Sequence, residues 1–245
     1  MRKLIFGTIL LLLPIICFGQ LVKTSVIAAS GSSEAGFPQI LAGTVTGETN
    51  IPAFYRHVIT MPDGVQVGDL ILVLFACDGA ETMSIYAGSN WTIEDQGTRA
   101  TDQVTGAVVW KIAEGGDQLT LLGTSTESAS FMVFRLSNFE TTNPLTITKA
   151  DAISTNPDPP SNTGEYGAVN YLWMAFVASG ATVVASAAPA DFGNLSTYVW
   201  SGGTTGANIS QARREYNFAD AYDPGTFTMD SQAWVCFNII INPVQ

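Results

Sequence analysis

The sequence predicts an all-β protein, a single antiparallel β-sandwich of jelly-roll type, with an immunoglobulin-like sandwich as the alternative. Three stretches are apolar at nearly every position, residues 70–77, 169–177 and 234–241. A strand of this kind must be covered on both faces, so we expect all three to be interior strands. Shorter strand patterns recur at regular spacing, and no stretch keeps a helical period over three turns. If the two sheets did not cover the apolar strands, a neighbouring subunit would have to.

The first 19 residues have the pattern of a secretory signal peptide. Arg2 and Lys3 precede an apolar stretch at 4–17, and Gly19 supplies the small residue for cleavage. The apolar stretch is short for a bilayer span, which needs about 20 residues, and no later stretch reaches that length without turn residues. We therefore expect a secreted protein, extracellular or on the cell surface with the periplasm as alternative, and no membrane span after signal removal.

Residues 20–50 are expected to form an N-terminal arm or the first strands, ahead of a sandwich domain at 51–245. Strand patterns at 21–29 and 40–46 are separated by a flexible Gly-Ser-Ser-Glu-Ala-Gly segment. An alternating strand at 54–60 then leads into the turn Met-Pro-Asp-Gly-Val-Gln-Val-Gly-Asp, in which Pro and Gly have the conformations that a tight turn requires.

The remaining expected strands are shorter or alternate polar with apolar positions. They lie at residues 91–94, 107–112, 118–122, 131–136, 145–148, 197–200, 209–212 and 226–229. We expect 118–122 to be the hairpin partner of 107–112, because a short Gly-rich turn separates them. The Pro-rich stretch 156–161 predicts a long surface crossing. The sequence shows no internal repeat.

The composition limits the classes of partner. The formal net charge is −11, and removal of Arg2 and Lys3 takes it to −13. Nucleic acid is excluded as a partner because phosphate binding needs clustered basic residues, and the adjacent Arg213 and Arg214 would point to opposite faces of a strand. The charged fraction is 13%, about half of the usual ~25%, which is typical of extracellular β-proteins rich in hydroxyl and amide side chains.

Several motifs resemble a loosely defined, largely uncharacterised family of β-sandwich proteins found in tailed-phage structural genes and in secreted bacterial proteins. They are the turn and strand at 61–73, Asn90-Trp91-Thr92, Val109-Trp110-Lys111-Ile112-Ala113, Phe134-Arg135-Leu136 and the closing 234–243, which together span residues 55–243. The family usually has Gly where this chain has Asn90, and a virion protein would not need a secretory leader. The resemblance implies a surface or particle-associated structural module without catalytic residues.

Cys77 and Cys236 are the two cysteines of the expected mature chain, and both lie in expected interior strands. Export would allow a disulfide between them, whereas the alternative is two buried free thiols. No basic residue lies near either of them in sequence to activate a thiol, so neither is expected to be catalytic.

His57 is the only histidine, so any mechanism that needs a histidine base would have to use it. No Gly-x-Ser-x-Gly motif accompanies it, and one histidine cannot supply the ligand set of a zinc enzyme. A glycoside hydrolase, which needs only two carboxylates, is the alternative to a non-catalytic protein. We expect no enzyme activity.

Two further groups of residues suggest binding sites. Asp220, Asp223 and Asp230 flank a Pro-Gly turn and could hold Ca²⁺, although turn capping by the aspartates explains the same pattern. The aromatic residues of polar or Gly-rich segments could stack on sugars, although packing in the core is the alternative. These are Trp91, Tyr198, Trp200 and Tyr222.

The sequence thus predicts a secreted structural or adhesive module that acts through protein contacts or self-association. A carbohydrate-binding, lectin-like module is the first alternative, and a phage virion decoration or tail-associated protein is the second. No cofactor other than Ca²⁺ is indicated.

Overall fold

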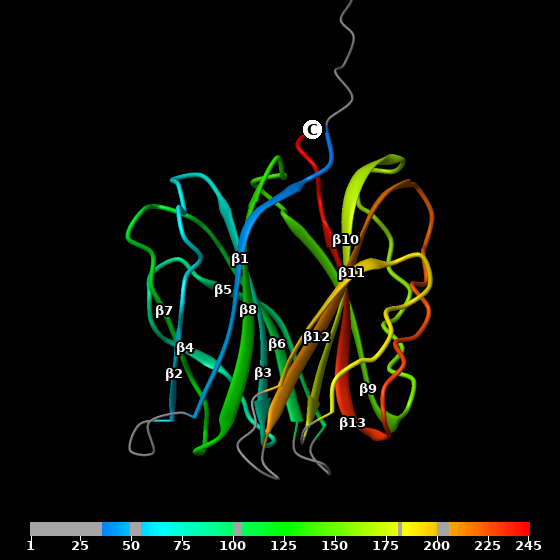
Figure 1. Ribbon diagram of the computed structural model, residues 1–245. Helices are drawn as coiled ribbons and strands as arrows, with labels where there is room; N and C mark the ends of the chain where they lie inside the picture. The colour runs from blue at the N-terminus through cyan, green and yellow to red at the C-terminus, as the bar shows by residue number, and fades with distance from the viewer. Residues whose placement is uncertain (1–35, 50–54, 100–103, 181–182, 200–205) are drawn as a thin grey trace, which may run out of the picture. The chain divides into compact units, whose positions relative to one another are not determined.

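The computed structural model describes residues 36–49, 55–99, 104–180, 183–199 and 206–245, which all belong to one unit that begins at Ser33 (Figure 1). These residues contain strands and no helix. The strands are β1 (Gln39–Thr49), β2 (Arg56–Ile59), β3 (Leu70–Asp78), β4 (Ser84–Ala87), β5 (Thr92–Arg99), β6 (Val104–Ile112), β7 (Leu119–Leu122), β8 (Ser128–Ser137), β9 (Leu145–Ser154), β10 (Val169–Gly180), β11 (Gly193–Val199), β12 (Ala207–Phe218) and β13 (Gln232–Ile241).

The strands form an antiparallel β-sandwich, as the sequence predicts. The first sheet has the order β1-β8-β3-β6-β5 and the second sheet has the order β11-β12-β10-β13-β9. A small sheet, β2-β7-β4, lies outside the first sheet. The predicted interior positions are confirmed, because β3, β10 and β13 each have a hydrogen-bonded neighbour on both sides.

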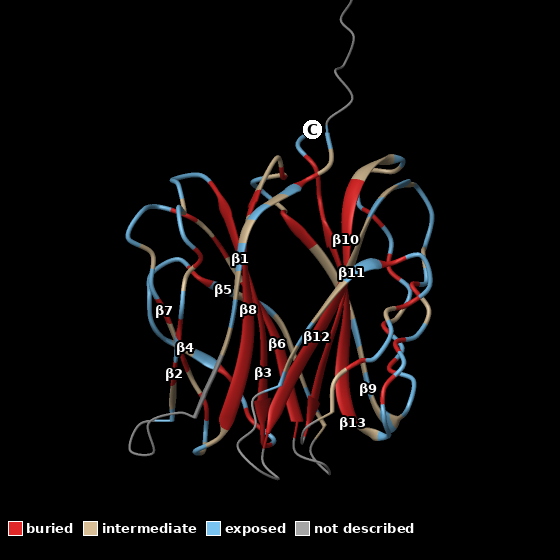
Figure 2. Ribbon diagram, in the orientation of Figure 1, coloured by how far each residue is buried: buried red, intermediate tan, exposed pale blue. Residues whose placement is uncertain are grey.

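Figure 2 shows that the interior strands are buried along most of their length. Alternate residues of these strands pack into different apolar layers. In β3, Leu72 and Leu74 enter the central core between the two large sheets, whereas Val73 and Phe75 pack against the small sheet. In β10 the residues on the outer face, such as Trp173, pack under the connecting loops of the second half. Each interior strand is therefore covered on both faces by its own chain, which explains why it does not alternate polar with apolar residues.

This layering removes one argument for self-association. The sequence suggested that a neighbouring subunit would cover the apolar strands if the two sheets did not. The small sheet covers the outer face of the first sheet, and loops carrying Phe192, Phe227 and Met229 cover that of the second. Any contact with a second copy must therefore be argued from another surface.

The two large sheets have the same strand order, which no repeat in the sequence indicates. The first half of the chain supplies β1, β3, β5, β6 and β8 to the first sheet, and the second half supplies β9 to β13 to the second. When these strands are numbered one to five in chain order within each half, both sheets have the order 1-5-2-4-3, with the second sheet read from β9 to β11. The outer layers correspond as well. In the first half, β2, β4 and β7 lie in the connections after the first, second and fourth strands of the large sheet, and β7 pairs with β2 and β4. In the second half, the connections at the same three places form the bridges Asn162–Tyr222 and Ala187–Thr228. Topologically, the sandwich is a tandem of two equivalent halves.

Three details of the sequence prediction are wrong. Residues 119–122 form β7, but this strand pairs with β2 and β4, not with the strand at 104–112. Residues 226–229 form no strand, and only Thr228 makes an isolated bridge. Residues 84–87 form β4, where the sequence patterns indicated no strand. The strand predicted at 40–46, by contrast, is confirmed as part of β1, which pairs with β8.

Candidate functional site

The two sides of the sandwich, where the edge strands of the two large sheets meet, differ in character. On one side β5 and β9 are joined by ion pairs between Arg99 Nη1 and Asp151 Oδ2, at 3.0 Å, and between Lys149 Nζ and Asp95 Oδ1, at 2.5 Å. Gly97 of β5 allows the first sheet to approach the second closely, because a Cβ at this position would lie 2.7 Å from Val235 Cγ1 of β13. We call this side, formed by β5 and β9, the closed side.

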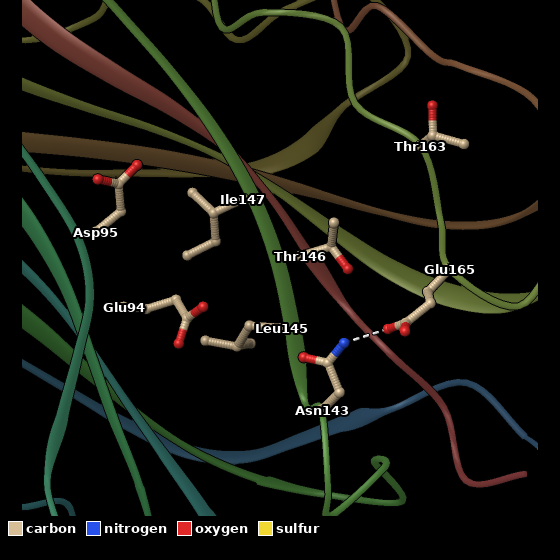
Figure 3. Close-up of a pocket in the computed structure, with 8 residues that line it drawn as sticks. All are labelled: Glu94, Asp95, Asn143, Leu145, Thr146, Ile147, Thr163 and Glu165. Atoms are coloured by element: carbon tan, nitrogen blue, oxygen red, sulfur yellow. Dashed lines mark hydrogen bonds between the residues drawn. The ribbon is translucent and has the colours of Figure 1, made fainter.

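A concave acidic site lies at the closed side, with a volume of about 440 Å³ (Figure 3). Its carboxylates are Glu94, Asp95 and Glu165, with Leu145 and Ile147 between them in the view. Each carboxylate already has a partner. Trp110 Nε1 donates to Glu94 Oε2 at 2.7 Å, Lys149 binds Asp95, and Asn143 Nδ2 donates to Glu165.

The side chains that line the acidic site are carboxylates and neutral groups. Its lining consists of the three carboxylates, Asn143, two threonines and two aliphatic side chains, without a histidine, cysteine or serine. Across the described residues no three His, Cys, Asp or Glu side chains gather as a metal site would require.

The other side, formed by β1 and β11, holds a groove between the sheets with a volume of about 340 Å³. We call it the β1 groove. Its lining combines residues of the first half of β1 with residues of β8, β11 and β12. These are Ile40, Leu41, Ala42, Gly43, Val45, Phe134, Asn194, Ser196, Gln211 and Arg213.

The floor of the β1 groove is an extension of the central core. Phe134 belongs to that core and is only 6% exposed. Gly43 lies directly against it, since a Cβ at Gly43 would be 3.2 Å from Phe134 Cδ1. At the rim, Leu41 is 48% and Val45 37% exposed, so two large apolar side chains of the same strand face solvent beside the groove.

Gln211 is the one buried polar group of the groove whose hydrogen bonding is incomplete. It is 2% exposed, and its Nε2 donates to Asn194 O at 3.2 Å. Its Oε1 is buried and has no hydrogen-bond partner. A buried acceptor without a partner costs roughly 1–3 kcal/mol.

The edge strand β1 lacks the usual protection against pairing. Among the described residues it pairs with β8 alone, which leaves the hydrogen-bonding groups of its outer edge available. Its eleven residues include no Lys, Arg or Pro, and the register shift between Ile40 and Ala42 affects only its start. Natural proteins normally block such edges with charge, proline or a bulge, as the charges of β5 and β9 do here.

The aromatic residues proposed for sugar binding are mainly packing residues. Trp91 is 7% exposed and its indole N–H donates to Gln118 O at 2.8 Å, so it is not an exposed platform. Tyr222 is half-buried, packs edge-on against Trp173 with ring centroids 5.4 Å apart, and accepts a hydrogen bond from Arg214. Tyr198 packs against the central core. Trp200 lies outside the described residues.

The other predicted sites are not assembled either. Asp220, Asp223 and Asp230 form no group that could hold a metal ion, and Asp223 Oδ1 instead accepts from Gly225 N within the turn, at 2.9 Å. For Cys77 and Cys236, the structure has the alternative of two buried free thiols and not the disulfide. Both thiols are free, and they lie in the two different outer layers, one on each sheet.

Both thiols and the histidine are buried. Burial raises the pKa of the Cys77 thiol well above its usual value, and burial likewise raises that of Cys236. His57 is 1% exposed and lies with its ring centroid 5.3 Å from that of Phe75. These groups are enclosed in the layers outside the first and second sheets.

Charged residues of the motifs that carry the family resemblance form ion pairs, one of them buried and one partly buried. Lys111 Nζ lies 2.7 Å from Asp117 Oδ1, and both side chains are less than 5% exposed. Arg135 Nε lies 2.5 Å from Asp69 Oδ2, which also accepts from Gln66 N. Lys111 and Arg135 therefore anchor turns to the first sheet, which is a structural role.

Sequence reasoning missed a cluster of acidic groups at the far end of β3. Asp78 is 8% exposed, and burial together with Glu127 raises its pKa to about 6. Burial of Glu81 opposes its ionisation, but hydrogen bonds from Ser125 and Thr124 outweigh burial and lower its pKa. The cluster ties two loops together, and the signal that could have found it is Asp78 directly after an apolar strand.

Comparisons with protein-family models, curated proteins and solved structures found no match to this chain. A search of the described residues found no helix that could cross a membrane.

Proposed function

We propose that this protein is a secreted, non-catalytic structural or adhesive module that acts through protein contacts made by β1 and the β1 groove. The observation that carries the proposal is the unprotected edge of β1, with Leu41 and Val45 exposed beside it. An exposed edge of this length pairs readily with another strand, whose backbone supplies affinity and whose alternate side chains supply specificity.

The contrast between the two sides supports the assignment. On the closed side the edge strands carry Asp95, Arg99, Lys149 and Asp151, which pair across the two sheets. On the other side β1 carries no basic residue, and the apolar floor of the β1 groove leads to the core. One side of the sandwich is thus protected against strand pairing and the other is not.

Binding to the native surface tests the proposal. The mature protein is labelled and its binding to intact cells or particles of its own source is measured. We expect the double variant Leu41→Lys/Val45→Lys to lose binding at least tenfold, because two charges then stand on the edge. The matched control is Ile153→Lys on β9, at a residue 50% exposed.

Ile153→Lys should bind as the wild type does, and both variants should melt within a few degrees of it. Equal binding by the β1 variant and the wild type would overturn the proposal. Binding that competes with free sugars and does not depend on β1 would instead favour the lectin-like alternative.

The particle-associated alternative predicts the same surface but a different location. Secretion is proposed from the N-terminal sequence alone, where basic residues precede an apolar stretch. Recovery of the protein only in assembled particles, with Met1 intact, would support a virion role and remove the secreted one.

A further inference from the structure

We propose that Arg213 binds the carboxylate of a small organic acid whose apolar body lies in the β1 groove. This inference goes beyond the proposed function, because it assigns a small-molecule ligand to the interior of the groove, beside the protein contact proposed for the edge of β1. It is carried by the unpaired charge of Arg213 and by the equivalence of the two halves of the sandwich, neither of which the proposed function uses.

Arg213 is the one cation of the described residues whose side chain has no partner. Its guanidinium makes no hydrogen bond, ion pair or aromatic contact with any of them. The other basic side chains of the described ranges each contact a carboxylate or an aromatic ring; they are Arg56, Arg99, Lys111, Arg135, Lys149 and Arg214. A guanidinium is always charged and has five N–H donors, so one without an acceptor is suited to bind an anion.

The side chain of Arg213 lies on the inner face of β12. Ile209 of the same strand belongs to the central core, and alternate side chains of a strand share a face, so Arg213 faces the first sheet as well. It is half-buried and lines both the β1 groove and an adjoining cavity of about 280 Å³, which Asn194 and Glu215 also line. Glu215 forms no ion pair with Arg213, and its Oε1 lies 3.5 Å from Gln39 Nε2. Arg213 is therefore accessible from two cavities.

Arg213 has an equivalent in the first half of the chain. In each half the third strand shifts its register on the fourth, and the shift comes just before Asp95 in β5 and just before Ser196 in β11. Two residues beyond the partners of these residues lie Trp110 in β6 and Arg213 in β12. Trp110 packs against the central core, so both side chains point between the large sheets. They occupy equivalent positions on the two sides of the sandwich.

The first half indicates which group the second half lacks. Trp110 donates its indole N–H to Glu94 Oε2, at 2.7 Å, and Glu94 is the residue of the register shift that lines the acidic site. In β11 the residue of the shift that lines the β1 groove is Asn194, whereas Leu195 packs in the outer layer. The amide of Asn194 carries no charge. The second half therefore has the donor without the carboxylate, and a carboxylate bound beside Arg213 would complete the same arrangement.

The remaining lining of the β1 groove suits a small acid with an apolar body. Phe134 forms the floor, and Gly43 beside it adds no side chain that would fill the space. The side chains of Asn194 and Ser196 make no hydrogen bond to another described residue, so they are available as donors to the carboxylate beside Arg213. The volume of about 340 Å³ lies at the lower end of the range for ligand pockets, roughly 300–1,000 Å³.

Titration of the mature protein with hexanoate, followed by NMR, tests the site. We expect saturable binding of hexanoate, binding of hexan-1-ol that is at least tenfold weaker, and no binding of hexylammonium. Butyrate has two CH₂ groups fewer and should bind about fifteenfold more weakly than hexanoate. Arg213→Gln should weaken the binding of hexanoate at least tenfold. Arg99→Gln is the matched control, because it removes the same charge on the closed side, and it should bind hexanoate as the wild type does.

A second variant tests the place of the apolar body. Gly43→Val keeps Arg213 but fills the groove beside Phe134, so it should also weaken the binding of hexanoate at least tenfold, and all variants should melt within a few degrees of the wild type. Unchanged binding by either groove variant would overturn the inference, as would equal affinity for hexan-1-ol or no saturable binding of hexanoate up to about 20 mM. Binding of a capped Thr-Glu-Thr peptide but of no free acid would assign the carboxylate to a protein partner instead. None of these results decides the proposed strand-edge contact, which is tested at Leu41 and Val45.

Discussion

Breaking the Lys111–Asp117 ion pair should destabilise the protein strongly. Lys111 is 4% and Asp117 2% exposed at the side chain, and their charged atoms lie 2.7 Å apart. Asp117 also accepts hydrogen bonds from Glu114 N and Gly115 N, at 3.1 and 3.0 Å, and so holds the turn after β6. Lys111→Met keeps the length of the side chain but leaves Asp117 buried without its cation.

The expected loss is about 3–5 kcal/mol of unfolding free energy, the range measured when one member of a buried pair is removed. At about 2–4 °C per kcal/mol for a protein of this size, the melting temperature should fall by roughly 6–20 °C. Lys149→Met is the matched control. Its pair with Asp95 is 39% and 29% exposed, so its loss should stay below about 1 kcal/mol.

The pH dependence provides an independent check. Burial by itself would lower the pKa of Lys111 and raise that of Asp117. For Lys111, the hydrogen bonds and charges of Asp117 and Glu114 outweigh burial and raise the pKa. For Asp117, hydrogen bonds from Lys111, Gly115 N and Glu114 N outweigh burial and lower the pKa. The pair therefore stabilises the fold above the ordinary aspartate pKa and below the ordinary lysine pKa, between about 4 and 10.5.

Urea denaturation followed by tryptophan fluorescence measures the effect at several pH values. The difference between wild type and Lys111→Met should be largest near pH 7 and shrink as pH falls through the lowered pKa of Asp117. A loss below about 1 kcal/mol at pH 7, equal to that of Lys149→Met, would refute the view that this pair is effectively buried.

Three further predictions follow from burial and from the N-terminal sequence. Asp78→Asn should stabilise the protein at pH 7 by about 1–3 kcal/mol and leave it unchanged near pH 4, because a pKa raised from 3.8 to about 6 costs stability only as pH rises; urea titrations at both pH values measure this. Leu72→Asp should unfold or aggregate the protein, since it buries an unpaired carboxylate in the central core, and wild-type-like melting would contradict it. Mass spectrometry of the native protein should find Gln20 as the first residue, whereas an intact Met1 would remove the secretory interpretation.

The candidate site was largely hidden from sequence reasoning. Leu41 and Val45 lie in a predicted strand, but nothing in the sequence says that this strand is an edge or that a groove opens beside it. Gln211 lies in an Asn-rich and Thr-rich stretch and becomes notable only because β12 buries its Oε1 without a partner. Trp91, by contrast, looked exposed because of its polar neighbours, and the small sheet covers it.

The placement of the two cysteines on different sheets, which the sequence does not reveal, explains why they form no disulfide. Cys77 and Cys236 both lie in interior strands, as predicted, but on the two different sheets with side chains on the outer faces. The side chains of a strand alternate, so a shift of one residue along either strand would have turned its thiol toward the central core. The sequence pattern cannot choose between these faces when both are apolar.

The sequence by itself determined the class of fold and the three strands at its centre. Continuous apolar stretches must be covered on both faces, and that requirement depends only on the residues within each stretch. The tertiary structure alone decided which strands are neighbours, that 119–122 joins the small sheet, and that the two halves share one topology. Strand pairing is made by backbone groups that every residue carries, so different side chains in the two halves can form the same sheet order and conceal it from the sequence.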